Sequence, residues 1–322
     1  MGYGNEEEVA KALVSGNFSR AVQLAEEWLH QIPLEGEQKE EREVARFAYI
    51  ISRFFLNRQE RLAFYPSGAE KARYFLGLLG DLEKYLHESG ERLVPSLYQA
   101  ARVFCHSQIA DGFAKDFRGQ KAYNLNTDEI VQLALSLLEI ENIRAAEEVL
   151  IFLYQLNPKS PLTLYLLAYA KHRLGQDEDA YRYFREAMLY RPEVISQYPD
   201  FLPGGVLRDL YRKVSEKGYD SRILQDRYFA LFAELYNLYP TTLSLPNSEI
   251  AKIAKEYDRL FKEYNQNPEV KDEIFPRLAH YLSWLIGISH ANHNFDEFDE
   301  WRKEMISLSP ELWEIYSRHH PL

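Results

Sequence analysis

The stretch from Pro161 to Glu193, PLTLYLLAYAKHRLGQDEDAYRYFREAMLYRPE, decides the fold class of this 322-residue chain. Two segments with apolar residues at helical spacing meet at Gly175, and Pro192 closes the second segment. Ala168 and Ala180 are small at the points where two antiparallel helices would approach most closely. Gly175 suits the left-handed position that often ends a helix. The stretch therefore predicts a helical hairpin.

The same pattern occurs once more, one period earlier in the chain. A step of 34 residues towards the N-terminus leads to Thr127 and places Ala134 and Ala146 at the two close-approach positions. Large side chains between the small ones would fill the remaining space to interior density. The residues predicted to pack the two hairpins are Ala134, Ala146, Ala168, Gly175, Ala180, Phe184 and Ala187.

This spacing resembles the tetratricopeptide repeat (TPR), a family of helix–turn–helix units of about 34 residues. Lys171 departs from the pattern, because the family prefers an aromatic residue there. Looser copies surround Gly16-Asn17-Phe18 and His293-Asn294-Phe295, the second with a bulky Phe298 at a small-residue position. The resemblance implies an all-α fold: a right-handed α-solenoid of TPR and TPR-like helical hairpins with about 12 to 14 helices.

The repeats divide the chain into three predicted parts. Residues 1–126 would form N-terminal TPR-like and divergent helical hairpins, and residues 127–193 the two in-phase TPR repeats. Residues 194–322 would form divergent hairpins that end in a TPR-like unit. Helical spacing continues where the 34-residue period fails, so no strand is expected.

Charge and composition exclude several functional classes. The chain has 38 Lys and Arg against 49 Asp and Glu, a net charge of −11, which disfavours binding to nucleic acid. No apolar run is long enough to span a membrane, so we expect no membrane insertion. The first eight residues are polar and acidic, unlike a signal peptide. The expected location is cytoplasmic, or periplasmic if a leader has been removed.

No local motif of a catalytic site occurs, and we expect no catalytic residue, cofactor or metal. The lone Cys105 excludes an intrachain disulfide. It precedes His106, but neighbouring side chains on a helix point about 100° apart and form a poor nucleophile–base pair. The best metal candidates are His280, His290 and His293, although His293 falls in the predicted turn.

The resemblance to the TPR family also implies a binding surface, because the first helix of each repeat lines a concave groove. The corresponding residues here are Tyr165, Tyr169, His172, Arg173, Val131, Gln132, Leu135 and, in the C-terminal unit, Trp284. Binding in the groove and packing on the next repeat stay open as alternatives for the two tyrosines. Some members of the family hold a partner's C-terminal carboxylate with Lys and Asn at the positions of Tyr165 and Tyr169. The two tyrosines disfavour this carboxylate-clamp subclass. The groove would suit an amphipathic helix or an apolar-aromatic segment.

A second candidate surface is basic. Arg42, Arg46 and Arg53 share a face of one predicted helix, where they could bind an acidic segment or a phosphate. The alternative is a solvated face that neighbours such as Glu43 neutralise. His319-His320, near the C-terminus, is predicted to be a solvated tail.

These patterns predict a non-catalytic scaffold or adaptor that binds other proteins or peptides. The family resemblance suggests a role in a bacterial envelope, secretion or motility assembly. Two alternatives remain open: a peptide-responsive TPR regulator, and a metal-dependent enzyme that uses the region of His280, His290 and His293.

Overall fold

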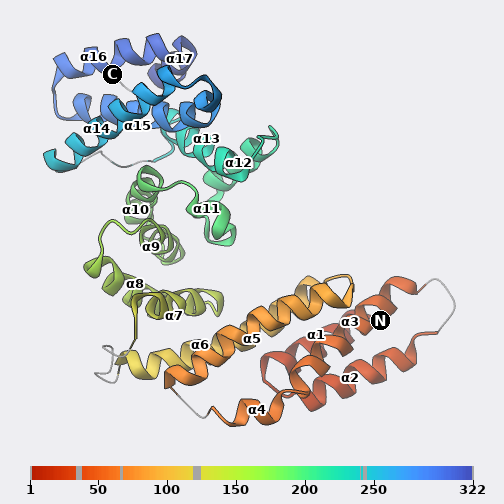
Figure 1. Ribbon diagram of the computed structural model, residues 1–322. Helices are drawn as coiled ribbons and strands as arrows, with labels where there is room; N and C mark the ends of the chain where they lie inside the picture. The colour runs from red at the N-terminus through yellow and green to blue at the C-terminus, as the bar shows by residue number, and fades with distance from the viewer. Residues whose placement is uncertain are drawn as a thin grey trace. The chain divides into compact units, whose positions relative to one another are not determined.

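The computed structural model describes residues 2–33, 38–65, 68–118, 125–239, 241 and 245–320 (Figure 1). These residues form seventeen α-helices and two short 3-10 helices, with no strand among them. The prediction of an all-α fold is confirmed. Among the described helices, none combines the length and hydropathy that a bilayer crossing requires. The chain divides into two compact units, Met1–Val149 and Leu150–Leu322, which are described separately.

Unit 1 contains seven helices and the first half of an eighth. They are α1 (Gly2–Val14), α2 (Phe18–Gln31), α3 (Lys39–Leu56), α4 (Gln59–Ala63), α5 (Gly68–Ser89), α6 (Pro95–Arg118), α7 (Thr127–Glu139) and α8 (Ile143–Leu156). Helix α2 packs against α1 and α3, and α6 packs against α5 and α7. Helix α1 also packs against α6. The chain therefore returns to its first helix within this unit, whereas a one-directional array would contact only neighbours.

Aromatic rings form the core of unit 1. Phe18 stacks on Phe55 with ring centroids 5.0 Å apart, and Phe104 meets both rings edge-on. The long helices α5 and α6 lie side by side (Figure 1). They approach each other closely at Gly112. A Cβ atom at Gly112 would lie 2.7 Å from the Gly68 carbonyl oxygen, so no larger residue fits without movement.

Unit 2 begins within α8. Its further elements are α9 (Pro161–Arg173), α10 (Asp177–Tyr190), α11 (Val194–Gln197), η2 (Pro199–Phe201), α12 (Gly205–Ser215), α13 (Arg222–Leu235), α14 (Asn247–Gln266), η3 (Pro268–Val270), α15 (Lys271–Ala291), α16 (Phe295–Leu308) and α17 (Pro310–His319). Helix α15 packs against α13, α14 and α16, and residues from Leu278 to Ile286 are almost all buried. It is the central helix of this unit.

The four predicted hairpin turns share one backbone design. After α9, the N–H of Gln176 donates to the carbonyl of Lys171 at 2.9 Å, and Gly175 has φ +75°. The turns after α1, α7 and α15 contain the same hydrogen bond, from a backbone N–H to the carbonyl five residues earlier. The donors are Asn17, Asn142 and Asn294, each at 2.9 Å from the acceptor. The left-handed position is taken by Gly16, Glu141 and His293, respectively. This is the Schellman arrangement, which satisfies carbonyl groups at a helix end.

All the residues predicted to pack the hairpins lie inside the protein except Gly175, for which the prediction is wrong. Ala134 and Ala146 are fully buried in unit 1, and in unit 2 the buried set is Ala168, Ala180, Phe184 and Ala187. Gly175 lies in the exposed turn. Small side chains at buried positions let neighbouring helices approach closely.

The turn design gives a test with a matched control. No atom lies within 4 Å of a Cβ built on Gly175, so Gly175→Ala changes only the backbone energy and should cost about 1 kcal/mol of stability. Gly80 in α5 has equally open surroundings but lies within the helix, so Gly80→Ala should add up to about 1 kcal/mol. Urea unfolding followed by circular dichroism measures both. Equal effects of the two substitutions would contradict the turn assignment.

Candidate functional site

Four of the predicted groove residues are buried, and Tyr165 and Trp284 are the most enclosed of them. Tyr165 is fully enclosed, and its hydroxyl donates to the Tyr198 carbonyl at 2.8 Å. Trp284 is 2% exposed, and its Nε1 donates to His280 Nε2 at 3.2 Å. These contacts correct the expectation that both side chains line an open groove. Both rings pack within unit 2, which is the packing alternative for Tyr165.

The other predicted groove residues are distributed over both units. In unit 2, Tyr169 is buried against Phe201 and accepts a hydrogen bond from Arg173 at 2.6 Å. His172 lies beside it, with Nδ1 2.7 Å from the Asp177 carboxylate. In unit 1, Leu135 is buried, and Val131 and Gln132 are half-buried. Four of the eight predicted groove residues remain accessible to solvent: Val131, Gln132, His172 and Arg173.

A groove of about 650 Å³ lies between α14, α15 and α16. Each helix contributes residues from one face. The lining residues are Leu245, Asn247, Ile250, Ala251, Ala254, Leu285, Ile288, Ser289, Asn292, Asn294, Glu297 and Trp301. This volume is in the range of pockets that bind ligands of drug size.

The groove has an apolar floor, and amide, hydroxyl and carboxylate groups line the rest of it. Leu285 and Ile288 are almost fully buried beneath it, and the Trp301 ring is held by an edge contact to Tyr257 at 5.5 Å. The rim includes the side chains of Asn247 and Asn292. An amide side chain both donates and accepts, so the rim can pair with either polar group of a peptide backbone.

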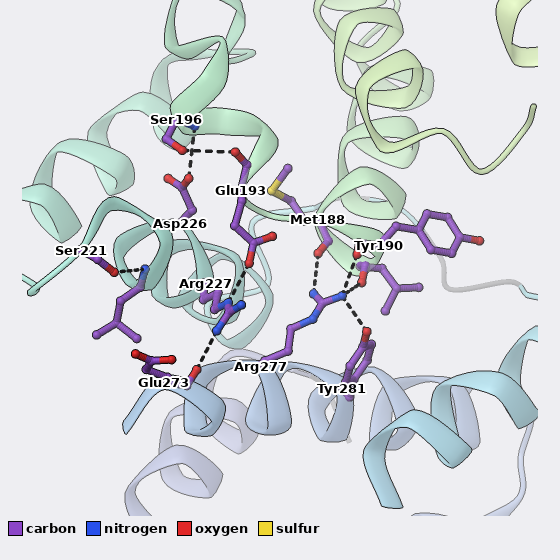
Figure 2. Close-up of polar contacts among 12 residues, drawn as sticks. Met188, Tyr190, Glu193, Ser196, Ser221, Asp226, Arg227, Glu273, Arg277 and Tyr281 are labelled. Carbon is purple, nitrogen blue, oxygen red and sulfur yellow. Dashed lines mark hydrogen bonds and ion pairs between the residues drawn. The ribbon is translucent and has the colours of Figure 1, made fainter. Parts of the chain in front are cut away.

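Arg277 positions the helix that forms this floor (Figure 2). It projects from α15 to the C-terminal end of α10, where its guanidinium donates to Met188 O at 2.9 Å and Tyr190 O at 3.0 Å. It also donates to the Leu189 carbonyl and, at 2.7 Å, to the Tyr281 hydroxyl. The last carbonyl groups of a helix have no partner within the helix. Arg277 supplies these partners and fixes α15 against α10.

A second arginine ties the start of α15 to α13. Arg227 donates to the Glu193 carboxylate at 2.7 Å and to the Glu273 carbonyl at 3.0 Å (Figure 2). The neighbouring Asp226 accepts from the Ser196 amide and the Tyr211 hydroxyl, while burial raises the pKa of its carboxyl group. Side chains of α13 thus hold α11, α12 and the first turn of α15.

The core of unit 2 contains a buried ion pair between Arg185 and Glu234. The Arg185 guanidinium also lies 5.0 Å from the Trp284 ring and donates to Thr241 O at 2.9 Å. The Glu234 carbonyl lies 2.9 Å from His320 Nε2. The prediction of a solvated His319-His320 tail is therefore wrong for His320: α17 packs on α13, and the His320 ring stacks on Tyr316 at 3.9 Å, whereas His319 is exposed.

The predicted metal candidates do not gather at one point. His280 is buried beside Trp284, His290 lies 5.5 Å from the Phe298 ring, and His293 is exposed in the turn. Among the described residues, no group of three His, Cys, Asp or Glu side chains is arranged to hold a metal ion. Cys105 is fully buried, and burial raises the pKa of its thiol.

The predicted basic face lies on α3. Arg46 forms an ion pair of 2.8 Å with Glu91, and Arg42 donates to the Pro33 carbonyl at 3.4 Å. The Arg53 guanidinium lies 5.9 Å from the centre of the Tyr49 ring. Each of the three guanidinium groups thus has a partner within unit 1.

Comparison with known proteins finds no matching family model, no matching curated protein and no matching solved structure. Function is therefore inferred from the residues of the chain itself.

The sequence gives a partial signal for the groove on α14–α16. Helical spacing of Leu285, Ile288 and Asn292 could indicate a shared face. Helix α15 is apolar on several faces, however, so spacing alone does not reveal which face remains open. The clamp by Arg277 joins residues almost ninety positions apart and leaves no local motif.

The clamp predicts a large stability effect at one arginine. Arg277→Met leaves three carbonyl groups of α10 without their donor and should destabilise the protein by about 3 kcal/mol. Arg259→Met is the control, because Arg259 makes only exposed ion pairs with Glu256 and Glu263 on α14. Its effect should stay below about 1 kcal/mol. Urea denaturation measures both, and similar losses would contradict the clamp.

The buried His280 predicts a pH dependence. Burial, reinforced by Arg277 and Arg185, lowers its pKa well below the usual value, so the unfolded state binds a proton first as the pH falls. The free energy of unfolding is therefore unaffected by the protonation of His280 above a pH of about 6.5. Below that pH it falls by up to about 1.4 kcal/mol per pH unit. His280→Gln keeps an acceptor for Trp284 but cannot be protonated. Between pH 7 and 5 it should lose less stability than the parent chain; parallel curves would contradict this.

Proposed function

We propose that this chain is a non-catalytic interaction protein built from TPR-like helical hairpins, and that it binds an extended, apolar segment of a partner protein. The binding site is the groove between α14, α15 and α16. The observation that carries the proposal is the combination of an apolar floor with an amide rim in that groove.

The recurring turn supports the TPR-like hairpins. The turns after α1, α7, α9 and α15 use the same hydrogen bond and the same left-handed position, in the four places where the sequence resembles the TPR family. A recurring turn with buried small residues is typical of helical repeats, which commonly bind other proteins.

The rim favours an extended segment over a helix as the occupant. A helix satisfies its own backbone groups, except at its ends. An extended segment leaves N–H and carbonyl groups that need partners. Asn247 and Asn292 can supply such partners, while alternate apolar side chains would contact Ile250 and Trp301, which are half-buried in the groove.

Peptide selection on the whole chain tests this proposal. A phage-displayed library of random peptides is selected on the parent protein and counter-selected on Ala251→Arg. Ala251 is exposed and lines the groove, so arginine there should block the site without disturbing the core. We expect enriched peptides with spaced apolar residues, and about tenfold weaker binding to the blocked variant by fluorescence anisotropy.

Ser248→Arg is the matched control, because Ser248 is exposed on α14 but does not line the groove. It should bind the selected peptides as the parent does. Failure to enrich peptides, or equal binding to Ala251→Arg, would contradict the proposed site.

A further inference from the structure

A separate pocket of about 550 Å³ lies between α12, α13 and the end of α17. It shares no residue with the groove on α14–α16. The lining residues are Val206, Asp209, Leu210, Lys213, Val214, Lys217, Phe232, Tyr236, Leu238 and His319. Most of this surface is apolar. Its charged residues are Asp209 and Lys213 on α12 and Lys217 directly after it.

Phe232 and Tyr236 form one wall of this pocket and belong to a row of nearly parallel aromatic rings. Tyr228, Phe232 and Tyr236 follow each other at one-turn intervals on α13, and their ring centroids are 5.9 and 6.0 Å apart. The ring planes differ by 23° and 18°, and all three side chains are half-buried. His319 meets Tyr236 edge-on at 5.3 Å and closes the row. These contacts hold the rings in place before any ligand binds.

Two ammonium groups and one carboxylate, that of Asp209, also line the pocket. Lys213 on α12 and Lys217 in the turn directly after it are both exposed, and the Lys217 ammonium lies 4.6 Å from the centre of the Phe232 ring. The carboxylate of Asp209 is paired with Arg212 at 3.1 Å. In the part of the chain that the structure describes, no carboxylate forms an ion pair with either lysine.

We infer that this pocket binds an acidic segment of a partner protein that carries apolar side chains between its carboxylates. Alternate side chains of an extended segment are spaced by about 7 Å, close to the spacing of about 6 Å between residues one turn apart on a helix. Two carboxylates can therefore reach Lys213 and Lys217 together. The intervening apolar side chain packs against Phe232, Leu210 and Val206.

The surroundings favour this occupant over two others. A free inorganic anion would leave the apolar wall unused. Nucleic acid could stack on the rings, but the net charge of the chain repels a polyanion, and two lysines neutralise few phosphates.

Fluorescence anisotropy with a defined probe tests the inference. The probe is the fluorescein-labelled peptide Ser-Glu-Leu-Glu-Phe-Glu-Ser, titrated with the whole chain. We expect saturable binding that weakens as salt rises. The peptide with Gln for Glu, and the peptide with Ala for Leu and Phe, should each bind about tenfold more weakly.

Substitutions then locate the site. Lys213→Glu with Lys217→Glu should weaken binding about tenfold or more, whereas Lys255→Glu with Lys262→Glu, at exposed positions on α14, should leave it unchanged at matched salt. Val206→Asp, at an exposed position of the pocket rim, should also weaken binding. Equal binding of the Gln peptide, displacement of the probe by oligothymidylate, or no effect of the Lys213 and Lys217 changes would overturn the inference. Ala251→Arg does not touch this pocket, so the two proposed sites fail or succeed independently.

Discussion

The C-terminal end of α10 needs hydrogen-bond donors, and Arg277 of α15 provides them. An α-helix leaves its last carbonyl groups unpaired, and burying them without partners is costly. One guanidinium group meets this need and at the same time fixes the central helix of unit 2. Because α15 carries Leu285, Ile288 and Asn292, the clamp also sets the floor of the groove between α14 and α16. Arg227 holds the start of the same helix, so the floor of the groove is built on a helix anchored at two points.

Local features of the fold could be predicted from the sequence. The turn residues Gly16 and Gly175, and the small Ala168 and Ala180, act through their own backbone or size, so their pattern is visible in the chain itself. The pairing of α1 with α6 and the docking of α17 could not be predicted this way. They depend on side chains far apart in sequence, such as His320 against the Glu234 carbonyl.

The binding surface was harder to predict than the helices. Residues Thr163 to Ala170 of α9 are all buried, so this helix has no single apolar face from which an open groove could be identified. Tyr165 was therefore an equally good candidate for packing and for binding, and its hydroxyl finds a partner inside unit 2. The aromatic row along α13 and the spacing of Lys213 and Lys217 by one helical turn are visible in the sequence. That these residues line one pocket becomes visible only in the fold, which brings α12 and α13 together.

Hydrogen–deuterium exchange of the whole chain, with and without a peptide selected for binding, tests the central claim most directly. If the groove on α14–α16 binds the partner, the bound peptide should slow amide exchange in α14, in the second half of α15 and in the first turns of α16. Exchange in α1, α2 and α3 should not change. Protection confined to α9 and α10, or no protection on binding, would contradict this account.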